Sequence, residues 1–361
     1  MGRLTRAETQ ERNRAKVLAA ARDEFAERGF RDAKVDDIAD RAELTRGAVY
    51  SNFPGKRALY LAVLAHLAET EPAPSHPQLG RTARDALGAL ARAWVARLPS
   101  GGADSARIGA ALVPEILADD RIRQPFAQLM KLNALLLGLA LERLRPLDSP
   151  VAAPARRSVR LAETVLTTLH GATQMTAAAP GFVEPFDIVS ACEQLAELEL
   201  GDWWAPPTVH PPVRPSDQPW DPPSATDVVR GEPAPLADDG VVAVLGLHRV
   251  AAVEEAVRAA PAGTEVTAVL VTGDPGELVP LARLAVAELC GCLRQAFPPP
   301  TWPGVRIVCD ESGELAAAAG APVVDDTTET AVHVRSGRIT ARADGPGACH
   351  AVALAETAQH A

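Results

Sequence analysis

The sequence predicts an all-α region followed by an α/β domain. Two helical units are expected over residues 1–67 and 68–200, a linker over 201–239 and the α/β domain over 240–361. Apolar residues recur at helical spacing through the first 200 positions, ten prolines crowd residues 201–240, and short β-rich runs alternate with helical segments beyond them. A chain of 361 residues is long enough for two or three domains.

Composition narrows the class of protein. No apolar run approaches the roughly 18 residues of a membrane span, and the N-terminus lacks the apolar stretch of a signal peptide, so we expect a cytoplasmic protein with no membrane partner. The five scattered cysteines do not resemble a disulfide framework. The chain as a whole has a net charge of −10, but its N-terminal segment is net positive, because residues 1–57 hold 13 Lys or Arg against 10 Asp or Glu. That end is the candidate nucleic-acid surface.

Four short helices are predicted between Glu11 and Leu67. The interruptions are Gly29, Glu43–Leu44 and Pro54–Gly55. The second helix is followed by a tight turn, and Thr45 is a suitable N-cap for the third. Two helices joined in this way form a helix-turn-helix, although a plain helical hairpin would show the same pattern.

Polar and positive groups gather around the short third helix. Tyr50, Ser51 and Asn52 place polar tips at its end, and positive charge brackets it at Lys34, Arg46, Lys56 and Arg57. Lys56 would begin the fourth helix, where the helix dipole disfavours a cation. Free N–H groups and an ammonium at that place can together hold a phosphate oxygen. These features favour a DNA-contacting helix over a plain hairpin.

The stretch "VLAAARDEFAERGFRDAKVDDIADRAELTRGAVYSNFPGKRALYLAVL" resembles the DNA-binding domain of the TetR/AcrR family of transcriptional regulators, across about Glu11 to Leu67. The Gly-Phe pair, the Asp-Ile-Ala triplet, the Tyr-x-x-Phe spacing and the following lysine all occur in register. The resemblance implies a homodimer that binds double-stranded DNA, with operator half-sites about one DNA turn apart. It also implies a helical domain whose small-molecule effector releases a repressor from its operator.

The resemblance assigns roles to single residues. Thr45, Arg46 and Gly47 fall at the groove-facing start of the recognition helix, with Tyr50 and Lys56 on phosphates. The full predicted DNA-binding set is Lys34, Thr45, Arg46, Gly47, Tyr50, Ser51, Asn52 and Lys56.

Two positions depart from the family pattern. Lys34 follows Ala33 where the family often has Thr or Ser, so a charged contact would replace a hydroxyl contact. Glu43 stands where the family usually has glycine, and would carry about 1 kcal/mol of strain if its φ is positive.

The helical middle is expected to hold the effector pocket and the dimer interface. Its last two helices, at about 152–179 and 184–200, carry apolar faces that by analogy pair with their mates across a two-fold axis. These faces are Val159, Val165, Leu166 and Leu169, then Ile188, Val189, Cys192 and Leu195. The alternative is that they pack within one subunit. Candidate pocket groups are His66, Trp94, Arg107, Asn133, His170 and Gln174, although any of them could instead be structural.

The C-terminal region alternates strands and helices. Strands are predicted at 241–247, 265–271, 305–310, 330–335 and 338–343, and helices at 251–260, 278–297, 314–319 and 348–359. Ser336-Gly337 is a two-residue hairpin signal. The proline-rich segment before this region should run as an extended linker.

The segment from Val308 to Gly347 resembles the second half of thioredoxin-like domains. An enzyme of that fold needs a reactive cysteine after an early strand, where this chain has His248, and the usual proline before the hairpin is also missing. Cys290 and Cys292 form the only close cysteine pair, and their spacing on a helix points the thiols apart. We therefore predict no enzyme activity, no cofactor and no metal. A redox or thiol-linked regulator or enzyme is the alternative, and the appended domain could serve as an interaction module or a sensor.

Overall fold

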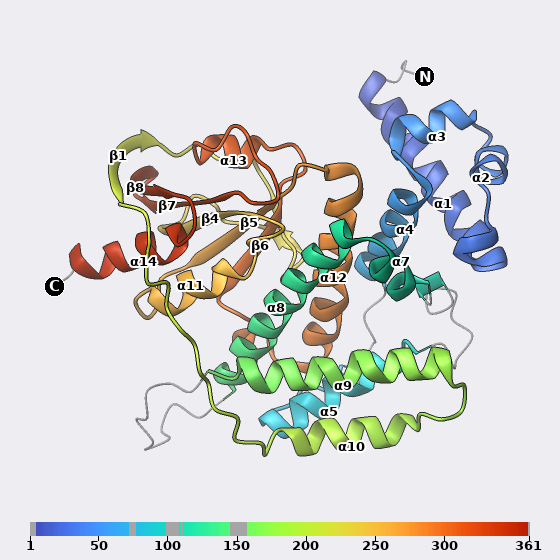
Figure 1. The fold of residues 1–361 in the computed structure, drawn as a ribbon, viewed down its shortest axis with the longest axis horizontal. Helices are drawn as coiled ribbons and strands as arrows, with labels where there is room; N and C mark the ends of the chain where they lie inside the picture. The colour runs from blue at the N-terminus through green and yellow to red at the C-terminus, as the bar shows by residue number, and fades with distance from the viewer. Residues whose placement is uncertain (1–4, 72–76, 99–107, 110, 145–156, 360–361) are drawn as a thin grey trace.

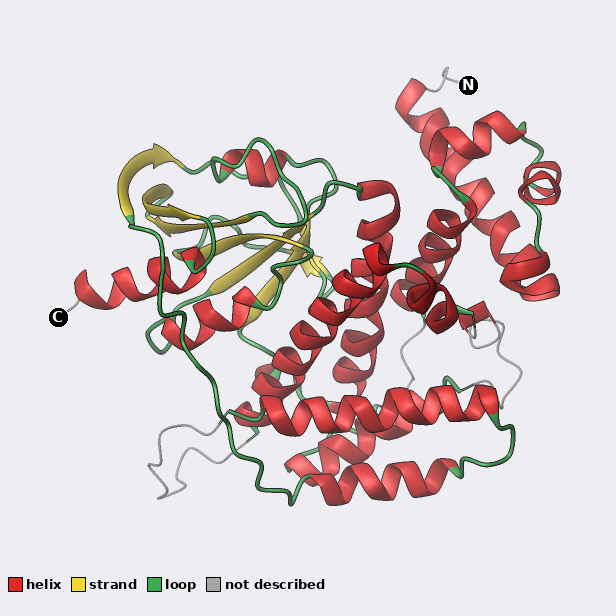
Figure 2. Cartoon of the chain, in the orientation of Figure 1, coloured by secondary structure: helices red, strands yellow, loops and turns green. Residues whose placement is uncertain are grey.

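The computed structural model describes residues 5–71, 77–98, 108–109, 111–144 and 157–359. Figure 1 shows the N-terminal helices at one corner, a layer of long helices beside them, and a sheet flanked by helices on the opposite side. Figure 2 separates the two kinds of structure, with the strands confined to the C-terminal part. Within the described ranges, no helix is both long enough and apolar enough to cross a membrane.

The N-terminal helices form a compact head. They are α1 (Arg6–Asp32), α2 (Val35–Arg41), α3 (Arg46–Asn52) and α4 (Lys56–Thr70). A capping box starts α1, since the Thr5 hydroxyl accepts from the Glu8 N–H and the Glu8 carboxylate accepts from the Thr5 N–H. In the core, Phe25 meets Tyr60 edge-on with ring centroids 5.5 Å apart. The Tyr60 hydroxyl donates to the Ile108 carbonyl at 2.6 Å, which ties the head to the helices beyond it.

The turn between α2 and α3 stores strain at Glu43. Its φ is +55°, in the left-handed region that favours glycine, so the strain expected from the sequence is present. The Glu43 side chain is exposed, and its carboxylate lies 3.6 Å from the Lys16 ammonium. Such a surface ion pair contributes little to the stability of the fold.

Replacing Glu43 with glycine should stabilise the protein. Relief of about 1–2 kcal/mol of strain exceeds the roughly 0.5–1 kcal/mol that glycine costs through unfolded-chain entropy. Urea unfolding of Glu43→Gly should therefore show a free energy of unfolding about 0.5–1 kcal/mol higher. Glu43→Gln is the matched control, because it removes the charge and keeps the β-carbon. An equal gain in Glu43→Gln would show that charge, and not φ, is responsible.

A helical body follows the head. Its helices are α5 (Ala83–Val95), α7 (Leu112–Ala118), α8 (Asp120–Arg143), α9 (Val159–Ala178) and α10 (Pro185–Leu195). The predicted intersubunit faces of α9 and α10 point inward, with Val165, Leu169 and Cys192 fully buried against α8 and α5. The assignment of these faces to a dimer contact is therefore wrong, and the alternative of packing within the subunit holds. Phe182 and Phe186, at the junction of α9 and α10, are 73% and 78% exposed.

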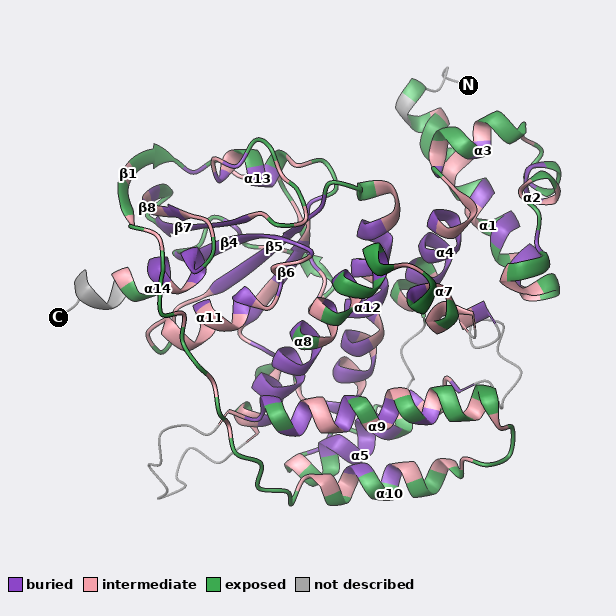
Figure 3. Cartoon of the chain, in the orientation of Figure 1, coloured by how far each residue is buried: buried purple, intermediate pink, exposed green. Residues whose placement is uncertain are grey.

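The helix α12 (Pro275–Ala296) joins the α/β domain to the helical body. It packs most extensively against α4, and also against α8 and α5. Apolar residues surround it on nearly all sides, as in a fully buried helix, and Figure 3 shows it buried between α8 and α4. Backbone carbonyls of α12 also accept hydrogen bonds from the helical part of the chain. The Asn133 amide donates to the Ala285 carbonyl at 2.9 Å, and the Gly80 N–H donates to the Ala296 carbonyl at 2.8 Å. The two units predicted as separate therefore share one continuous core.

The α/β domain is built on a sheet of order β1-β8-β7-β4-β5-β6, in which β4, β5 and β6 are parallel and β7 and β8 antiparallel. Its predicted strands are present as β4 (Gly240–Gly246), β5 (Val266–Val271), β6 (Val305–Cys309), β7 (Glu329–Arg335) and β8 (Arg338–Asp344). The predicted helices are α11 (Ala252–Ala259), α12, α13 (Glu314–Ala318) and α14 (Ala348–Gln359). Ser336 and Gly337 both have positive φ in the hairpin turn.

Side chains of the central strands alternate between two faces of this sheet. One face packs with α11, α12 and α14, as Val241, Ala243 and Leu245 do, and it belongs to the continuous core. The other face, with Val242 and Val244, forms a smaller core with α13. The first face is the one that connects the sheet to the helical body.

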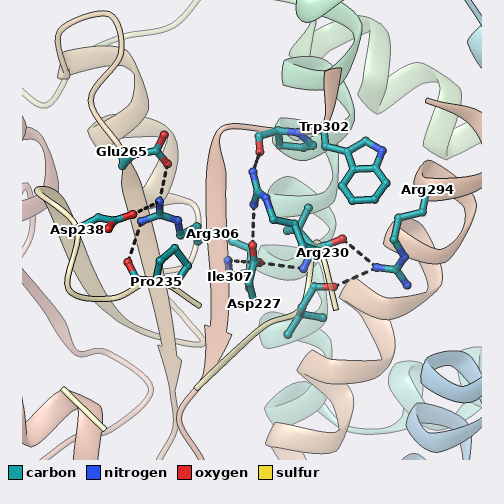
Figure 4. A network of polar contacts seen from close by, with 12 residues as sticks. Asp227, Arg230, Pro235, Asp238, Glu265, Arg294, Trp302, Arg306 and Ile307 are labelled. Atoms are coloured by element: carbon teal, nitrogen blue, oxygen red, sulfur yellow. Dashed lines mark hydrogen bonds and ion pairs between the residues drawn. The ribbon is translucent and has the colours of Figure 1, made fainter. Parts of the chain in front are cut away.

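The proline-rich segment differs from the expected plain linker. It contains β1 (Arg214–Pro219), an edge strand on β8, and the short pair β2 (Thr226–Asp227) and β3 (Glu232–Pro233). Prolines are tolerated at such an edge because one side of the strand needs no partner. Figure 4 shows how the segment is anchored: buried Asp227 accepts from the Ile307 N–H and pairs with Arg230, while Arg294 of α12 donates to the Val228 and Val229 carbonyls.

The cysteine thiols of the described chain are all free, and burial raises their pKa values. Cys290 and Cys292 are fully buried on α12, with pKa values of about 12 and about 11. Thiols held in this way are poor nucleophiles. The α/β character of the domain is present, and its likeness to thioredoxin stays a prediction.

Candidate nucleic-acid interface and ligand cavity

The exposed face of α3 presents the residues predicted to read DNA. Thr45, Arg46, Gly47, Tyr50 and Ser51 are exposed in one short stretch. Val49 and Phe53 turn the opposite side into the head core, where both are 2% exposed. The short helix therefore has one packing face and one free face.

Local hydrogen bonds hold this free face in place. The Thr45 hydroxyl caps α3 by accepting from the Ala48 N–H at 3.2 Å. At the other end, the Ser51 hydroxyl and the Asn52 amide both donate to the Ala48 carbonyl. The Arg46 guanidinium lies 5.5 Å from the Tyr50 ring centroid and 3.3 Å from Asp36. Arg46 is thus positioned by exposed contacts that a base edge or phosphate can replace.

The two predicted phosphate lysines lie in different settings. Lys34 is exposed just before α2. Lys56 begins α4, but its ammonium donates to the Arg31 carbonyl at 3.0 Å and lies 4.8 Å from the Phe30 ring centroid. Burial lowers the pKa of Lys56. Its unfavourable place at the start of α4 is therefore offset by the carbonyl end of α1, where a cation is favoured.

The next residue, Arg57, links the head to both other parts of the chain. Its guanidinium binds Glu277 of α12 through two hydrogen bonds, at 2.5 and 3.0 Å, and Asp119 at 3.0 Å. The three side chains are only 15–21% exposed. Next to this group, a β-carbon added to Gly276 would lie 2.8 Å from the Pro54 ring. The first turn of α12 therefore touches the loop that carries α3 into α4.

A cavity of about 420 Å³ lies inside the helical body. It is bounded by α4, α5, α7, α8, α9 and α12. Its apolar lining includes Leu64, Leu67, Leu98, Val113, Phe126 and Leu284, and its polar lining is Thr70, Glu71, Trp94, Arg97, His170, Thr173, Gln174 and Glu288. A largely apolar pocket of this size with several polar groups is typical of a small-molecule site.

The polar groups of the cavity have distinct environments. The Trp94 indole donates to the Thr173 hydroxyl at 3.0 Å and meets the His170 ring edge-on at 4.9 Å. Burial lowers the pKa of His170 to about 4, so its ring is neutral at pH 7, and its Nε2 has no hydrogen-bond partner among the described residues. Burial raises the pKa of Glu288 to about 7, against the opposing effect of Arg97.

A second hollow of about 520 Å³ lies at the carboxyl end of β6. Most of its charged groups already form ion pairs or hydrogen bonds with other residues of the chain. Arg283 pairs with Glu69, and Asp310 accepts from the backbone N–H groups of Gly313 and Ala316. The helical cavity is therefore the stronger candidate for a ligand.

Residues 17–63 match the family model described as "Bacterial regulatory proteins, tetR family". The N-terminal domain belongs to the TetR family. Among curated proteins, the chain is 41% identical over 80 residues to the HTH-type transcriptional regulator SrpR of Pseudomonas putida, covering 22% of this chain and 37% of SrpR. It is also 41% identical over 80 residues to the uncharacterized HTH-type transcriptional regulator TtgW, likewise of Pseudomonas putida, covering 22% of this chain and 59% of TtgW.

Each of these matches spans less than two thirds of the relative. A TetR transcriptional regulator from Rhodococcus sp. RHA1 aligns in structure over 53% of this chain and 95% of its own, at 18% identity. Its TM-score of 0.34 gives no basis for comparing the two arrangements.

The structure separates the six residues predicted for the effector pocket. Trp94, His170 and Gln174 line the cavity together. His66 lies in another hollow, between α1 and α4, and Asn133 is buried with its amide on the α12 backbone. Neither residue lines the cavity that holds Trp94, His170 and Gln174, so their assignment to that pocket is wrong. Asn133 is instead directed at the helix α12. Arg107 lies outside the described residues.

Sequence reasoning missed the residues that α12 brings to the site. Glu277 and Glu288 lie more than 200 positions beyond the head, on a helix assigned to another domain. The available signal was the presence of carboxylates on a largely apolar helix, because acidic groups are rare on a buried helix without a partner or a role.

Proposed function

We propose that this chain is a homodimeric transcriptional repressor that leaves a pseudo-palindromic operator when a small molecule enters the helical cavity. The exposed face of α3 carries the proposal, because a packed helix that presents Thr45, Arg46 and Tyr50 to solvent fits the major groove. α4 supports the effector step, since it begins in the head at Lys56 and lines the cavity with Leu64 and Leu67.

The two-fold contact would use surfaces that remain exposed. Met175, Phe182 and Phe186 are large exposed hydrophobic residues at one end of α9 and α10. Large apolar side chains gathered at one surface are typical of an interface between proteins. Sedimentation of the full chain with and without DNA tests the proposed dimer, and a monomer on DNA would contradict it.

Selection of bound DNA from a random pool by the full chain tests DNA recognition directly. We expect an inverted repeat with half-sites about one helical turn apart. Recovery of sequences without a common motif would contradict the proposal.

Substitutions in the head should separate phosphate contacts from base contacts. Lys56→Ala should weaken binding to every sequence and flatten the plot of log affinity against log salt by about one unit, because one phosphate contact is lost. Tyr50→Phe should also weaken binding uniformly. Arg46→Ala should instead relax the preference among operator sequences. Gel-shift titrations at several salt concentrations measure both effects.

Lys131→Ala is the matched control, since Lys131 is an exposed lysine on α8, outside the head. An unchanged salt slope in Lys56→Ala would contradict the phosphate role and leave Lys56 as a cap for α1.

A further inference from the structure

The helix α12 contributes Leu284 and Glu288 to the cavity, although it belongs to the α/β domain and not to the TetR-type part of the chain. We propose that the cavity binds an amphipathic organic cation, a protonated amine on an aromatic or apolar body, and that Glu288 is the group that recognises the amine. This inference rests on the proposed effector cavity and names the class of its ligand.

The charges around the cavity favour a cation. Arg97 is engaged by the fold, because it pairs with Glu71 at 2.7 Å and donates to the Glu288 backbone carbonyl at 3.1 Å. His170, on α9, is neutral at pH 7 because burial lowers its pKa. The lining residues described on α7 and α8 are apolar. Among the described lining residues, the Glu288 carboxylate is therefore the charge left for a ligand to neutralise.

The walls suit the remainder of such a molecule. Phe126 and Leu284 offer apolar surface, and Trp94 offers an aromatic ring near which a cation is stabilised. The Nε2 of His170, buried and without a partner among the described residues, can exchange a hydrogen bond with a polar group on the ligand body. A volume of about 420 Å³ holds a drug-sized or smaller molecule.

The same helix connects this carboxylate to the head. Glu288 lies three turns along α12 from Glu277, which binds Arg57 at the start of α4. Neutralising Glu288 removes the cost of a charge held in an apolar cavity. A ligand there therefore acts on the helix whose first turn contacts the DNA-binding domain.

Isothermal titration calorimetry of the full chain with three probes of one shape tests the inference. The probes are 4-phenylbutylamine, 4-phenylbutanol and 4-phenylbutyrate. At about pH 8 the amine should bind about tenfold tighter than the alcohol, as expected for a charge-assisted hydrogen bond, and the acid should bind more weakly than the alcohol. Since burial raises the pKa of Glu288 to about 7, affinity for the amine should rise between about pH 6 and about pH 8, where the amine itself stays protonated.

Glu288→Gln keeps the size of the side chain and removes its charge. It should abolish both the preference for the amine and its pH dependence, and leave affinity for the alcohol within about twofold. Glu314→Gln, an exposed carboxylate in the same domain, is the matched control. Equal affinity of the amine and the alcohol in the parent chain, or a preference that survives Glu288→Gln, would overturn the ligand class.

Gel shifts on the selected operator keep this inference distinct from the proposed function. Amine binding that depends on Glu288 but leaves operator affinity unchanged would uphold the ligand class and contradict effector release. Loss of operator affinity on addition of the amine in the parent chain, but not in Glu288→Gln, would support both.

Discussion

A chain that ends at Leu200 should fail to form a stable helical body. Removing α12 exposes the sides of α4, α5 and α8 that it covers. Five leucines of α12 are buried, and at about 1.5–3 kcal/mol each their burial amounts to about 10 kcal/mol. That is comparable to the whole stability of a typical protein, about 5–15 kcal/mol. Size-exclusion chromatography and thermal melting by circular dichroism should show aggregated or non-cooperative material.

Supplying the missing part separately provides the control. Co-expression of residues 1–200 with residues 201–361 should restore a soluble complex, because α12 remains within its own sheet and can dock. A shortened chain that melts cooperatively at the temperature of the full chain would contradict the shared core. In that case the α/β domain would be an accessory to an independent regulator.

The ion pair between Arg57 and Glu277 should couple the α/β domain to the DNA-binding head. A double-mutant cycle of Arg57→Met and Glu277→Gln, measured by urea unfolding, should give a coupling energy of about 1–3 kcal/mol, because both side chains are largely buried. Asp119 remains neutralised in Arg57→Met by Arg121, which lies 3.1 Å away. Operator affinity should fall in Glu277→Gln, since the head loses a contact that limits its orientation.

The surface pair Arg160 and Glu163 on α9 serves as the matched control. Its side chains are 47% and 38% exposed, and the same cycle there should give less than about 0.5 kcal/mol. A coupling energy between Arg57 and Glu277 no larger than this would mean that the head is oriented by packing alone. Gly276→Ala, which presses a methyl group against Pro54, should then be the more damaging change for operator affinity.

Local patterns predicted most of the secondary structure. The five β-rich runs of the C-terminal region are strands in the structure, because alternating β-branched residues and the Ser336-Gly337 turn act over a few positions. The same holds for the strain at Glu43, which follows from a side chain at a turn position that needs positive φ. The strand in the proline-rich segment was harder to predict from sequence, since it forms only by pairing with β8, more than 100 residues away.

The DNA-reading face could be anticipated because the whole motif lies within one continuous stretch. The structure keeps Thr45, Arg46, Gly47, Tyr50 and Ser51 on one exposed surface. It also gives Lys56 a structural partner, the Arg31 carbonyl, that its place in the sequence did not suggest. Contact with DNA at each of these residues stays a prediction.

The sequence by itself determined the helix-turn-helix, its cap at Thr45 and the order of strands and helices beyond residue 240, because caps, turns and periodicity depend on near neighbours. The tertiary structure alone decided where α12 belongs. A helix that is apolar on nearly every side must be buried, but this requirement does not specify its partners. Those partners are α4, α5 and α8, and their packing places Glu288 in the cavity and Glu277 on Arg57. The junction between the N-terminal head, the helical cavity and the α/β domain thus arises from contacts between residues far apart in the chain.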